Sequence, residues 1–356
     1  MLRRGAFSAT PHSDVRKYNY RMSRICIVPR VDGLAGVASF RLKFEDGLRA
    51  RRIEVTHDPN QPADVVLVLA GTKKLLPLWR ARRRGMRIVQ RLDGINWVHR
   101  VRWAGLRYTI RAVYGNALLS LIRNRLADRV IYQSQFIKQW WEDWYRPARV
   151  RSSVILNGVD LDRYTPTGLH ERPSQHYRLL VVEGSLVGGL DSGLFDAADL
   201  ANTLSKKFKI ELVIVGRVHA RTKSKLKNQN AFRIRFMDAV PREHIPWLMR
   251  SSHLLFSAEV NPPCPNSVIE ALSCGLPVIG FDTGSLAEIV QGDAGWVVPY
   301  GGNPWKLEPP DIPALADAAT EVLEDQPRFR KSAREQAESE LGLDRMVDEY
   351  LKVLLG

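Results

Sequence analysis

The sequence predicts an α/β fold made of two doubly wound, Rossmann-like domains that face each other across a cleft. Short apolar runs of strand length alternate with segments of helical periodicity, and this pattern starts twice, at Ile25 and again at Leu179. Between the two halves, residues 157–177 are rich in Gly, Pro, Thr, His and Ser and have little apolar periodicity. A chain of 356 residues also exceeds the usual size of a single hydrophobic core.

In the first half, the expected strands are Ile25–Pro29, Ile53–Val55, Val65–Leu69, Arg87–Gln90, Ala127–Tyr132 and Val154–Leu156. A loop containing Gly33 and Gly36 follows the first strand, and the apolar residues after it recur at helical spacing. Two further segments predict helices, the basic stretch Leu75–Arg84 and the Trp-rich stretch Ser134–Tyr145. Strands joined by helices in this way form a parallel sheet.

In the second half, the expected strands are Leu179–Val182, Ile210–Val215, Ile234–Phe236, His253–Phe256 and Pro277–Gly280. The expected helices are Leu194–Phe208, Pro241–Arg250, Ser267–Cys274, Ile312–Leu323 and Phe329–Leu355. We therefore expect one domain at 23–160, a linker at 161–178, a second domain at 179–335, and a helix at 336–356 that returns to the first domain. Residues 1–22 are expected to be a disordered extension, with Met22 as an alternative start of translation.

Composition excludes several classes of protein. Hydrophobic residues make up 45% of the chain and charged residues 26%, which is typical of a folded globular protein. No apolar run reaches the length of a transmembrane helix, and the N-terminus lacks the apolar region of a secretory signal. The three cysteines are odd in number and lack metal-ligand spacing, so we expect packing thiols at Cys264 and Cys274 and a cytoplasmic location.

The positive charge is concentrated in the first half. The formal net charge is +15, and residues 73–129 hold fifteen Lys and Arg against two acids, Asp93 and Asp128. Within this region, residues 96–126 combine many Arg with Trp, Leu, Ile and Val. Two interpretations stay open: an amphipathic segment that lies on an anionic membrane surface at the inner face, or a helical pair packed on the sheet with solvated Arg. Nucleic acid is disfavoured because no recognised binding motif accompanies the charge.

The most informative stretch is Pro265–Pro277, with the sequence PNSVIEALSCGLP. Asn266 is a good N-cap residue and Gly275 a good residue to end the helix. The free N–H groups around Ser267 and Val268, at the positive end of the helix dipole, suit a diphosphate. One turn later, Glu270 can accept hydrogen bonds from two vicinal hydroxyls, as recognition of ribose requires.

This stretch, the following TGSLAEIV at 283–290 and the NGVD sequence at 157–160 resemble the signature of the family-four retaining glycosyltransferases, the glycosyl transferases group 1. The resemblance implies the GT-B fold and transfer of a sugar from a nucleoside-diphosphate sugar, without a metal or other cofactor. It assigns the acceptor to the first domain and the nucleotide sugar to the second. It also implies that Glu270 contacts ribose, and it brings Gly284 and Ser285 to the donor.

The chain departs from the family pattern at three places. The family has a first carboxylate eight positions before Glu270, where this sequence has Pro262, and Glu259 is the candidate substitute that would touch the sugar. The family's Arg and Lys after the first strand of the second domain are missing from Val182–Gly189. Backbone N–H groups of Gly184, Gly188 and Gly189, and the side chain of Arg217, are the candidate replacements.

The third departure is Asp93, which stands where the family often has a histidine. Catalysis or acceptor orientation at Asp93 competes with a role as a turn-capping residue. Glu288 is either a donor-side contact or a solvated carboxylate. Gly33 and Gly36 either approach a substrate or form a tight turn, and His99 is expected to be a surface residue.

The leading hypothesis is a retaining glycosyltransferase acting on a saccharide, lipid-linked or other acceptor. The alternative is a catalytically degraded GT-B protein that binds a nucleotide or glycan.

Overall fold

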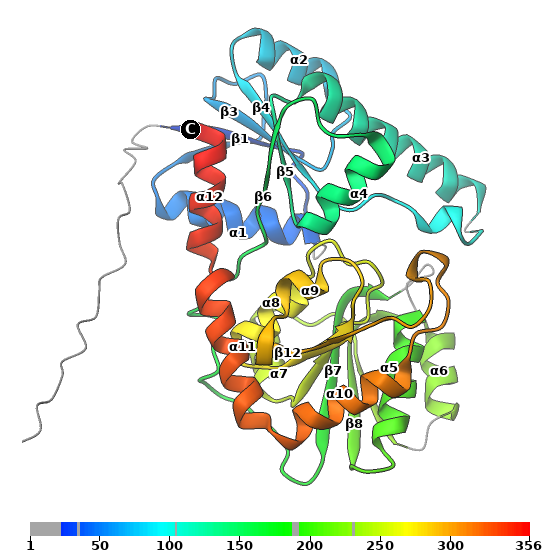
Figure 1. Cartoon of the computed structure of the whole chain (residues 1–356). Helices are drawn as coiled ribbons and strands as arrows, with labels where there is room; N and C mark the ends of the chain where they lie inside the picture. The colour runs from blue at the N-terminus through cyan, green and yellow to red at the C-terminus, as the bar shows by residue number, and fades with distance from the viewer. Residues whose placement is uncertain (1–22, 34–35, 104, 187–191, 230–231) are drawn as a thin grey trace, which may run out of the picture.

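The computed structural model describes residues 23–356 apart from 34–35, 104, 187–191 and 230–231. The expected extension at 1–22 lies outside the described residues, as do Gly188 and Gly189. Within the described part, two six-stranded sheets, each with all strands parallel, form two domains stacked one on the other (Figure 1). The predicted α/β fold with two doubly wound domains is confirmed.

The first domain has the strand order β2-β1-β3-β4-β5-β6. Its strands are β1 (Arg24–Val28), β2 (Glu54–Thr56), β3 (Val65–Leu69), β4 (Arg87–Leu92), β5 (Arg129–Tyr132) and β6 (Arg151–Val154). Its helices are α1 (Gly36–Ala50), α2 (Leu75–Arg83), α3 (Leu106–Leu121) and α4 (Gln135–Tyr145), with a 3-10 turn η1 (Val98–Arg100) and a π-helical turn η2 (Ile122–Leu126).

The second domain has the strand order β12-β11-β10-β7-β8-β9. Its strands are β7 (Tyr177–Leu186), β8 (Ile210–Val218), β9 (Arg233–Met237), β10 (Leu254–Phe256), β11 (Val278–Phe281) and β12 (Gly295–Val298). Its helices are α5 (Ser192–Leu204), α6 (Ala220–Gln229), α7 (Ile245–Arg250), α8 (Asn266–Ser273), α9 (Leu286–Ile289), α10 (Ile312–Glu324) and α11 (Gln326–Glu340), with 3-10 turns η3 (Arg242–His244), η4 (Gly292–Ala294) and η5 (Pro304–Lys306).

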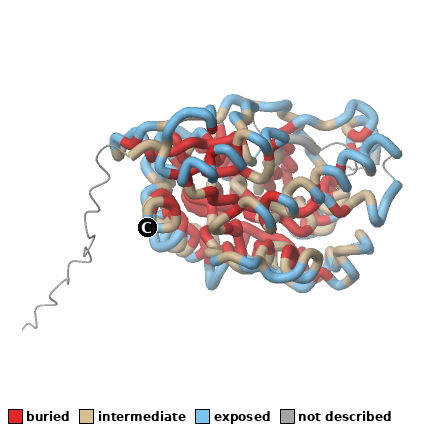
Figure 2. Tube along the Cα trace, turned by 90° about the horizontal axis from the view of Figure 1, so that it is seen from above, coloured by how far each residue is buried: buried red, intermediate tan, exposed pale blue. Residues whose placement is uncertain are grey.

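The strands bury alternate side chains on the two faces of each sheet. In β1, Ile25 and Ile27 join a core under α1, whereas Cys26 and Val28 join the core under α2. In β7, Leu179 packs toward α5 and α10, and Leu180 packs toward α7 and α8. Helices therefore cover both faces of both sheets, and the strands form the buried interior of each domain (Figure 2).

The last helix, α12 (Leu343–Leu355), packs on the first domain beside α1 (Figure 1). The Tyr350 ring packs against both Phe40 and Phe44, whose ring centroids lie 5.2 and 5.1 Å from its own. The single helix expected at Phe329–Leu355 is wrong, because the chain breaks at Leu341 and Gly342 into α11 and α12. The break allows the Leu341 carbonyl to accept from the Val159 N–H at 2.9 Å and the Leu343 N–H to donate to the Val159 carbonyl at 2.8 Å.

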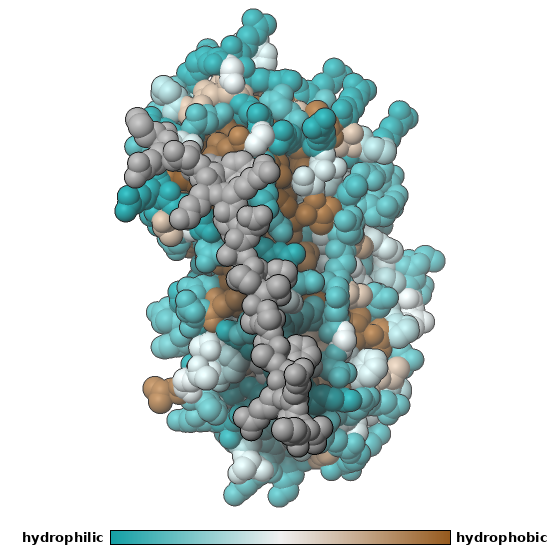
Figure 3. All heavy atoms as spheres, turned by 60° about the vertical axis from the view of Figure 1, so that its left-hand side comes forward, coloured by the Kyte–Doolittle hydropathy of each residue, from teal (hydrophilic) through white to brown (hydrophobic). Residues whose placement is uncertain are grey.

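The chain therefore crosses between the domains twice at one place. The first crossing, at 157–159, pairs with the second through a bridge between Val159 and Gly342. In the space-filling view, the molecule is narrower between the two domains than across either of them (Figure 3). No helix among the described residues has the length and apolar character needed to cross a membrane.

Candidate active site

A cavity of about 380 Å³ lies between the two domains. From the first domain it is lined by residues that follow strands of the sheet or begin a helix, which include Gly36, Val37, Ser39, Asp93 and Gln133. From the second domain the lining includes Glu183, Arg242, Glu259, Asn266, Ser267 and Glu270. Loops at the carboxyl ends of two facing parallel sheets thus converge on one space, as expected for ligand sites of doubly wound folds.

The N-termini of two helices meet at this cavity. Asn266 and Ser267 begin α8, whose preceding residue is Pro265 and whose first N–H groups receive no side-chain cap. Gly36 begins α1 from the opposite domain, and a Cβ placed on it would lie 3.9 Å from Asn266 Nδ2. Both positive dipole ends and their unpaired N–H groups therefore face the same space, which favours an anion there.

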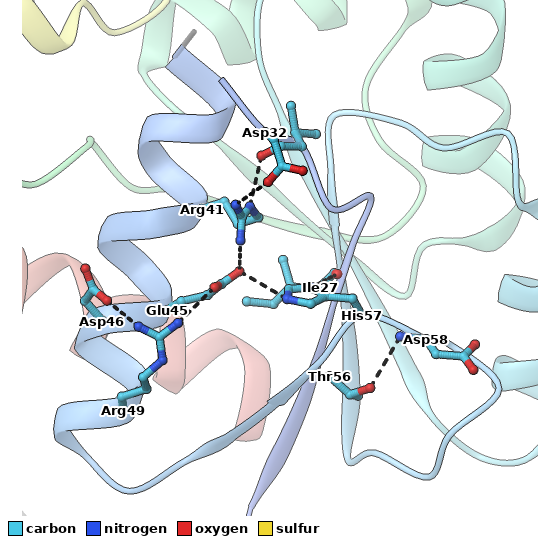
Figure 4. A network of polar contacts seen from close by, with 10 residues as sticks. Ile27, Asp32, Arg41, Glu45, Asp46, Arg49, Thr56, His57 and Asp58 are labelled. Carbon is cyan, nitrogen blue, oxygen red and sulfur yellow. Dashed lines mark hydrogen bonds and ion pairs between the residues drawn. The ribbon is translucent and has the colours of Figure 1, made fainter. Parts of the chain in front are cut away.

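A buried ion-pair network holds the loop that leads into α1 (Figure 4). Arg41 donates to the Val31 carbonyl at 3.0 Å and to Asp32 at 3.1 Å, and it pairs with Glu45 at 2.7 Å. Arg41 and Glu45 are 4% and 3% exposed, so this pair is held in a low-dielectric environment. It ties Val31 and Asp32, which follow β1, to the helix α1. Gly33 lies in that loop, exposed, with φ +123°, a backbone conformation that favours glycine.

Glu270 lines the cavity and forms an ion pair that sequence reasoning missed. Lys43 Nζ, from α1 of the opposite domain, lies 2.9 Å from Glu270 Oε1, and the two side chains are 14% and 12% exposed. Nothing in the local sequence identifies Lys43, because the two residues are 227 positions apart and meet only when the domains face each other. The carboxylate expected to contact ribose is therefore already charge-compensated across the interface.

Asp93 follows β4 and belongs to a buried polar network at the base of the cavity. Its carboxylate accepts hydrogen bonds from Arg91, which is 1% exposed, and from Gln133 Nε2 at 2.5 Å. Arg91 also donates to Asn157 Oδ1 at 3.0 Å, and Asn157 Nδ2 lies 3.2 Å from Asn266 Oδ1. Burial raises the pKa of Asp93, and the Arg91 guanidinium offsets part of the rise. Asp93 is thus fixed in the cavity wall.

Two carboxylates line the cavity where the family resemblance calls for cations and for the sugar contact. Burial raises the pKa of Glu259 to about 7. Burial and the neighbouring Glu259 raise the pKa of Glu183, a residue of β7, well above its usual range. Within the described residues, no three His, Cys, Asp or Glu side chains are grouped so that they could hold a metal ion.

The cation that lines the cavity is Arg242, which sequence reasoning also missed. One of its terminal guanidinium nitrogens is buried and has no hydrogen-bond partner among the described residues. It comes from η3, a single turn after Pro241 with no recognisable motif, inside a segment expected to be one helix from Pro241 to Arg250. Arg217, in contrast, is an exposed residue of β8 and is absent from the cavity lining.

Other candidate residues lie behind the cavity. Val268 is fully buried in the core of the second domain, and Gly184 lies within β7. Gly284, with φ +63°, lets the chain pass close to Pro262, and Ser285 N–H donates to the Pro262 carbonyl at 2.9 Å. These two residues therefore shape the loop that carries Pro262. Cys264 is buried and lines the cavity, and its sulfur accepts from the Asn157 N–H at 3.3 Å.

Glu288 joins the two domains. Its carboxylate accepts hydrogen bonds from the backbone N–H groups of Gln135 at 2.8 Å and Phe136 at 2.6 Å, at the N-terminus of α4. Beside it, Ser134 Oγ donates to the Pro263 carbonyl at 2.8 Å. Glu288 was expected to be either a solvated carboxylate or a contact to the donor. The structure shows neither: its carboxylate caps a helix of the other domain. His99 is half-buried, and burial together with Arg100 lowers its pKa.

Comparison with known proteins finds a family match within the second domain. Residues 184–325 match the model of the family described as glycosyl transferases group 1, which confirms the resemblance found in the sequence. No curated protein sequence matches the chain.

Solved structures similar to this chain are GT-B glycosyltransferases. Sucrose-phosphate synthase from Thermosynechococcus elongatus is 16% identical, with a TM-score of 0.69, over 94% of this chain and 98% of that one. WaaG, a glycosyltransferase involved in lipopolysaccharide biosynthesis, is 16% identical, with a TM-score of 0.69, over 94% and 100%. Anabaena HepE in complex with UDP-glucose is 16% identical, with a TM-score of 0.66, over 93% and 100%. At these identities, the similarity establishes the fold.

Proposed function

We propose, from a second domain that matches the glycosyl transferases group 1 and from the GT-B fold of the whole chain, that this protein transfers a sugar from a nucleoside-diphosphate sugar to an acceptor. The observation that carries the proposal is the convergence of the α1 and α8 N-termini on one interdomain cavity. Two helix N-termini from opposite domains suit the diphosphate of a donor, since that group carries the largest charge of the substrate.

The proposed donor position follows from the chemistry of the lining residues. The diphosphate would accept hydrogen bonds from the N–H groups of Asn266 and Ser267, and the unpartnered nitrogen of Arg242 would add a positive charge. Glu270 would accept from the ribose hydroxyls. Because these donors are fixed before the reaction, they would stabilise the charge that develops on the leaving diphosphate. The sugar would then lie toward Glu259 and Asp93, which line the same cavity.

We propose that the reaction retains the anomeric configuration and needs no metal, as the family resemblance implies. The leaving-group charge would be met by helix N-termini and Arg242 instead of a metal ion. Proton NMR of the first product formed gives the configuration of the new bond, and an inverted product would refute retention. Rates measured with and without EDTA test the metal, and a loss of rate that Mg²⁺ or Mn²⁺ restores would refute metal independence.

The transfer itself is tested with a panel of nucleoside-diphosphate sugars, with nucleotide release measured in the presence and absence of mono- and oligosaccharide acceptors. We expect Arg242→Ala to weaken the affinity for the free nucleoside diphosphate about tenfold or more, because a charge-assisted hydrogen bond is lost. Glu270→Ala should weaken it as well. Arg217→Ala is the matched control, because Arg217 is exposed and outside the cavity. Equal effects of Arg217→Ala and Arg242→Ala would contradict the proposed donor position.

A second candidate is a binding protein with a degraded donor site. It is favoured by Pro262 at the position of the family's first carboxylate and by the acidic pair Glu183 and Glu259, which would repel a diphosphate when ionised. This candidate predicts weak or absent affinity for UDP and GDP. Calorimetry with UDP, GDP and the nucleoside diphosphates of the other donors in the panel separates the two candidates, since the enzyme must bind at least one of them.

We also propose that the first domain associates with an anionic membrane surface. Ala112 and Asn116 are the buried residues of α3, and Leu118 and Leu119 pack partly on the cores of the domain. The other large apolar side chains of this helix are exposed. Trp103, Leu106 and Ile110 are 79%, 63% and 60% exposed. Exposed arginines accompany these apolar residues, namely Arg100, Arg102, Arg107 and Arg111. An apolar face next to cationic side chains suits insertion at the level of anionic headgroups.

Binding to vesicles tests this association. We expect the protein to sediment with vesicles that contain phosphatidylglycerol and to bind weakly to phosphatidylcholine alone, with affinity falling as salt rises. Ile110→Asp should reduce binding, whereas Leu169→Asp, at a residue 87% exposed on the second domain, should leave it unchanged. Indifference to anionic lipid would contradict the proposal. A saccharide acceptor carried on a membrane lipid would be consistent with this placement.

A further inference from the structure

A second pocket of about 450 Å³ lies beside the candidate active site, where α4 of the first domain meets η5 of the second. Its walls are mainly aromatic, with Trp97, Phe136, Trp140, Trp144 and Trp305. We call it the aromatic pocket. Neither the family resemblance nor the donor position described above uses any of these five side chains.

Of the six ring contacts among these side chains, three are edge to face, two are tilted, and Phe136 stacks on Trp305 at 6.0 Å. Trp305 lies 4.8 Å from Trp140 and 5.2 Å from Trp97, at interplanar angles of 66° and 73°. Trp140 and Trp144 are 5.7 Å apart at 88°. In an edge-to-face pair, the ring that presents its edge keeps both of its faces uncovered by that contact. Trp97 and Trp140 are buried, whereas Trp144 and Trp305 are only partly buried and keep ring surface toward the pocket.

Polar groups accompany the aromatic walls. Trp140 is 4% exposed, and its indole Nε1–H is buried without a hydrogen-bond partner among the described residues. A buried donor without an acceptor is costly, so a ligand oxygen that reached this N–H would be held by a favourable hydrogen bond. At the rim, Gln139 Nε2 and Asp143 Oδ1 lie 2.6 Å apart, and the Arg100 guanidinium lies 3.9 Å from the Trp144 ring centroid.

These features match the chemistry of a sugar ring. A pyranose has an apolar C–H face that packs on an aromatic ring, and hydroxyls around its edge that need donors and acceptors. Small-molecule sites generally combine apolar walls with a few placed polar groups in this manner. An alkyl chain would fill the walls, but it would leave the Trp140 N–H unpaired and would bury polar groups beside hydrocarbon. The observations therefore favour a saccharide.

The position of the aromatic pocket connects it to the candidate active site. Phe136 lines the aromatic pocket, and its backbone N–H is held by Glu288 at the domain interface. Gln133, three residues earlier, lines the active-site cavity. Both domains contribute to each space, so the two sites form together when the domains close.

We infer that the aromatic pocket binds a saccharide unit of the acceptor, one that remains outside the reacting centre. This inference rests on the proposed function, because it names the acceptor as an oligosaccharide or a glycan-bearing molecule. Arg100 beside the Trp144 ring would also accommodate an anionic substituent on that sugar.

The test begins with the full chain on a glycan array, with and without UDP or GDP, followed by calorimetry with the best glycan. We expect Trp144→Ala to weaken glycan binding about tenfold or more, because one aromatic wall is removed. Trp144→Phe should restore most of the affinity, which separates lost stacking from misfolding. Trp79→Ala is the matched control, since Trp79 is 43% exposed on α2, away from the pocket, and it should bind like the wild type.

Three results would overturn the inference. The first is a wild-type protein that binds no glycan, with or without nucleotide. The second is Trp144→Ala that binds glycans as the wild type does. The third is affinity that follows an alkyl chain, with decyl glycosides bound and methyl glycosides of the same sugars ignored. Affinity for UDP and GDP, measured on the same variants, tests the proposed function independently. A chain that binds glycans through Trp144 but no nucleotide would refute the transferase and keep the saccharide site.

Discussion

Replacement of Glu288 by alanine should weaken the contact between the two domains. In the structure, this carboxylate accepts two backbone hydrogen bonds at the N-terminus of α4, at 2.8 and 2.6 Å. Loss of a helix cap costs about 0.5–2 kcal/mol, and loss of the favourable charge–dipole interaction costs about 0.3–1 kcal/mol more. Two effects reduce the sum: Glu288 is half-exposed, so water can replace it, and Ser134 still caps α4 through the Ile137 N–H at 3.1 Å.

We therefore expect Glu288→Ala to lower the free energy of unfolding by about 1–2 kcal/mol. Glu288→Gln keeps one oxygen acceptor without the charge and should lose roughly half as much. Urea unfolding followed by tryptophan fluorescence measures both, and it reports the interface directly because Trp97, Trp140 and Trp305 meet there. High salt should narrow the difference between the variants and the wild type.

The control is Glu335→Ala, which removes an exposed carboxylate 3.7 Å from Lys331 on α11. A surface pair of this kind contributes about 0–1 kcal/mol. The reasoning is refuted if Glu288→Ala has the same free energy of unfolding as the wild type, or if Glu335→Ala lowers the free energy of unfolding as much as Glu288→Ala does. Either result would mean that the α4 N-terminus is equally well satisfied by water when the domains separate.

Three further predictions address the cavity and the cores. Burial raises the pKa of Glu259 to about 7 in the folded protein, whereas in the unfolded chain this carboxyl loses its proton near pH 4.5. The free energy of unfolding should therefore fall as pH rises from about 4.5 to 7, and the affinity for a nucleoside diphosphate should fall as pH approaches 7. Glu259→Gln should flatten both pH profiles. Tyr350→Ala should cost about 3–5 kcal/mol in urea unfolding, because the ring is fully buried between α12 and α1; a cost near zero would contradict the packing of α12. Gly284→Ala should cost more than about 1 kcal/mol, because φ is +63° and the added Cβ would lie 2.4 Å from Pro262 N; unchanged stability would contradict this turn.

The fold could be predicted because its signals are local. Buried strands such as Val65–Leu69 are continuous apolar runs, and the strands of parallel sheets covered on both faces are expected to look this way. Two elements were not expected: the helix α6, which has a low apolar content over its ten residues, and the strand β12, which is only four residues long. The break between α11 and α12 escaped too, since it depends on a hydrogen bond to Val159 far away in the chain.

Some residues of the cavity could be predicted from the sequence, and others could not. Asn266, Ser267 and Glu270 could be named because a helix start and its first turn are visible in sequence. Lys43 and Arg242 could not, because their importance depends on the packing of distant elements and not on their neighbours along the chain. The aromatic pocket escaped for the same reason, since Trp305 meets Trp97 and Trp140 only across the interface.

The return of α12 to the first domain has a consequence for how this chain matures on the ribosome. The first domain begins at residue 24, but Met346, Val347, Tyr350, Leu351 and Leu354 belong to its core. These side chains follow the whole second domain in the chain, so the domain whose synthesis starts first is completed only after the second has been synthesised. Until then, the face of α1 that carries Phe40 and Phe44 lacks its cover, and the second domain, whose helices and strands precede α12, can fold before it. Synthesis of α12 is therefore the step that closes the first core, and the bridge between Val159 and Gly342 before it links the two domains.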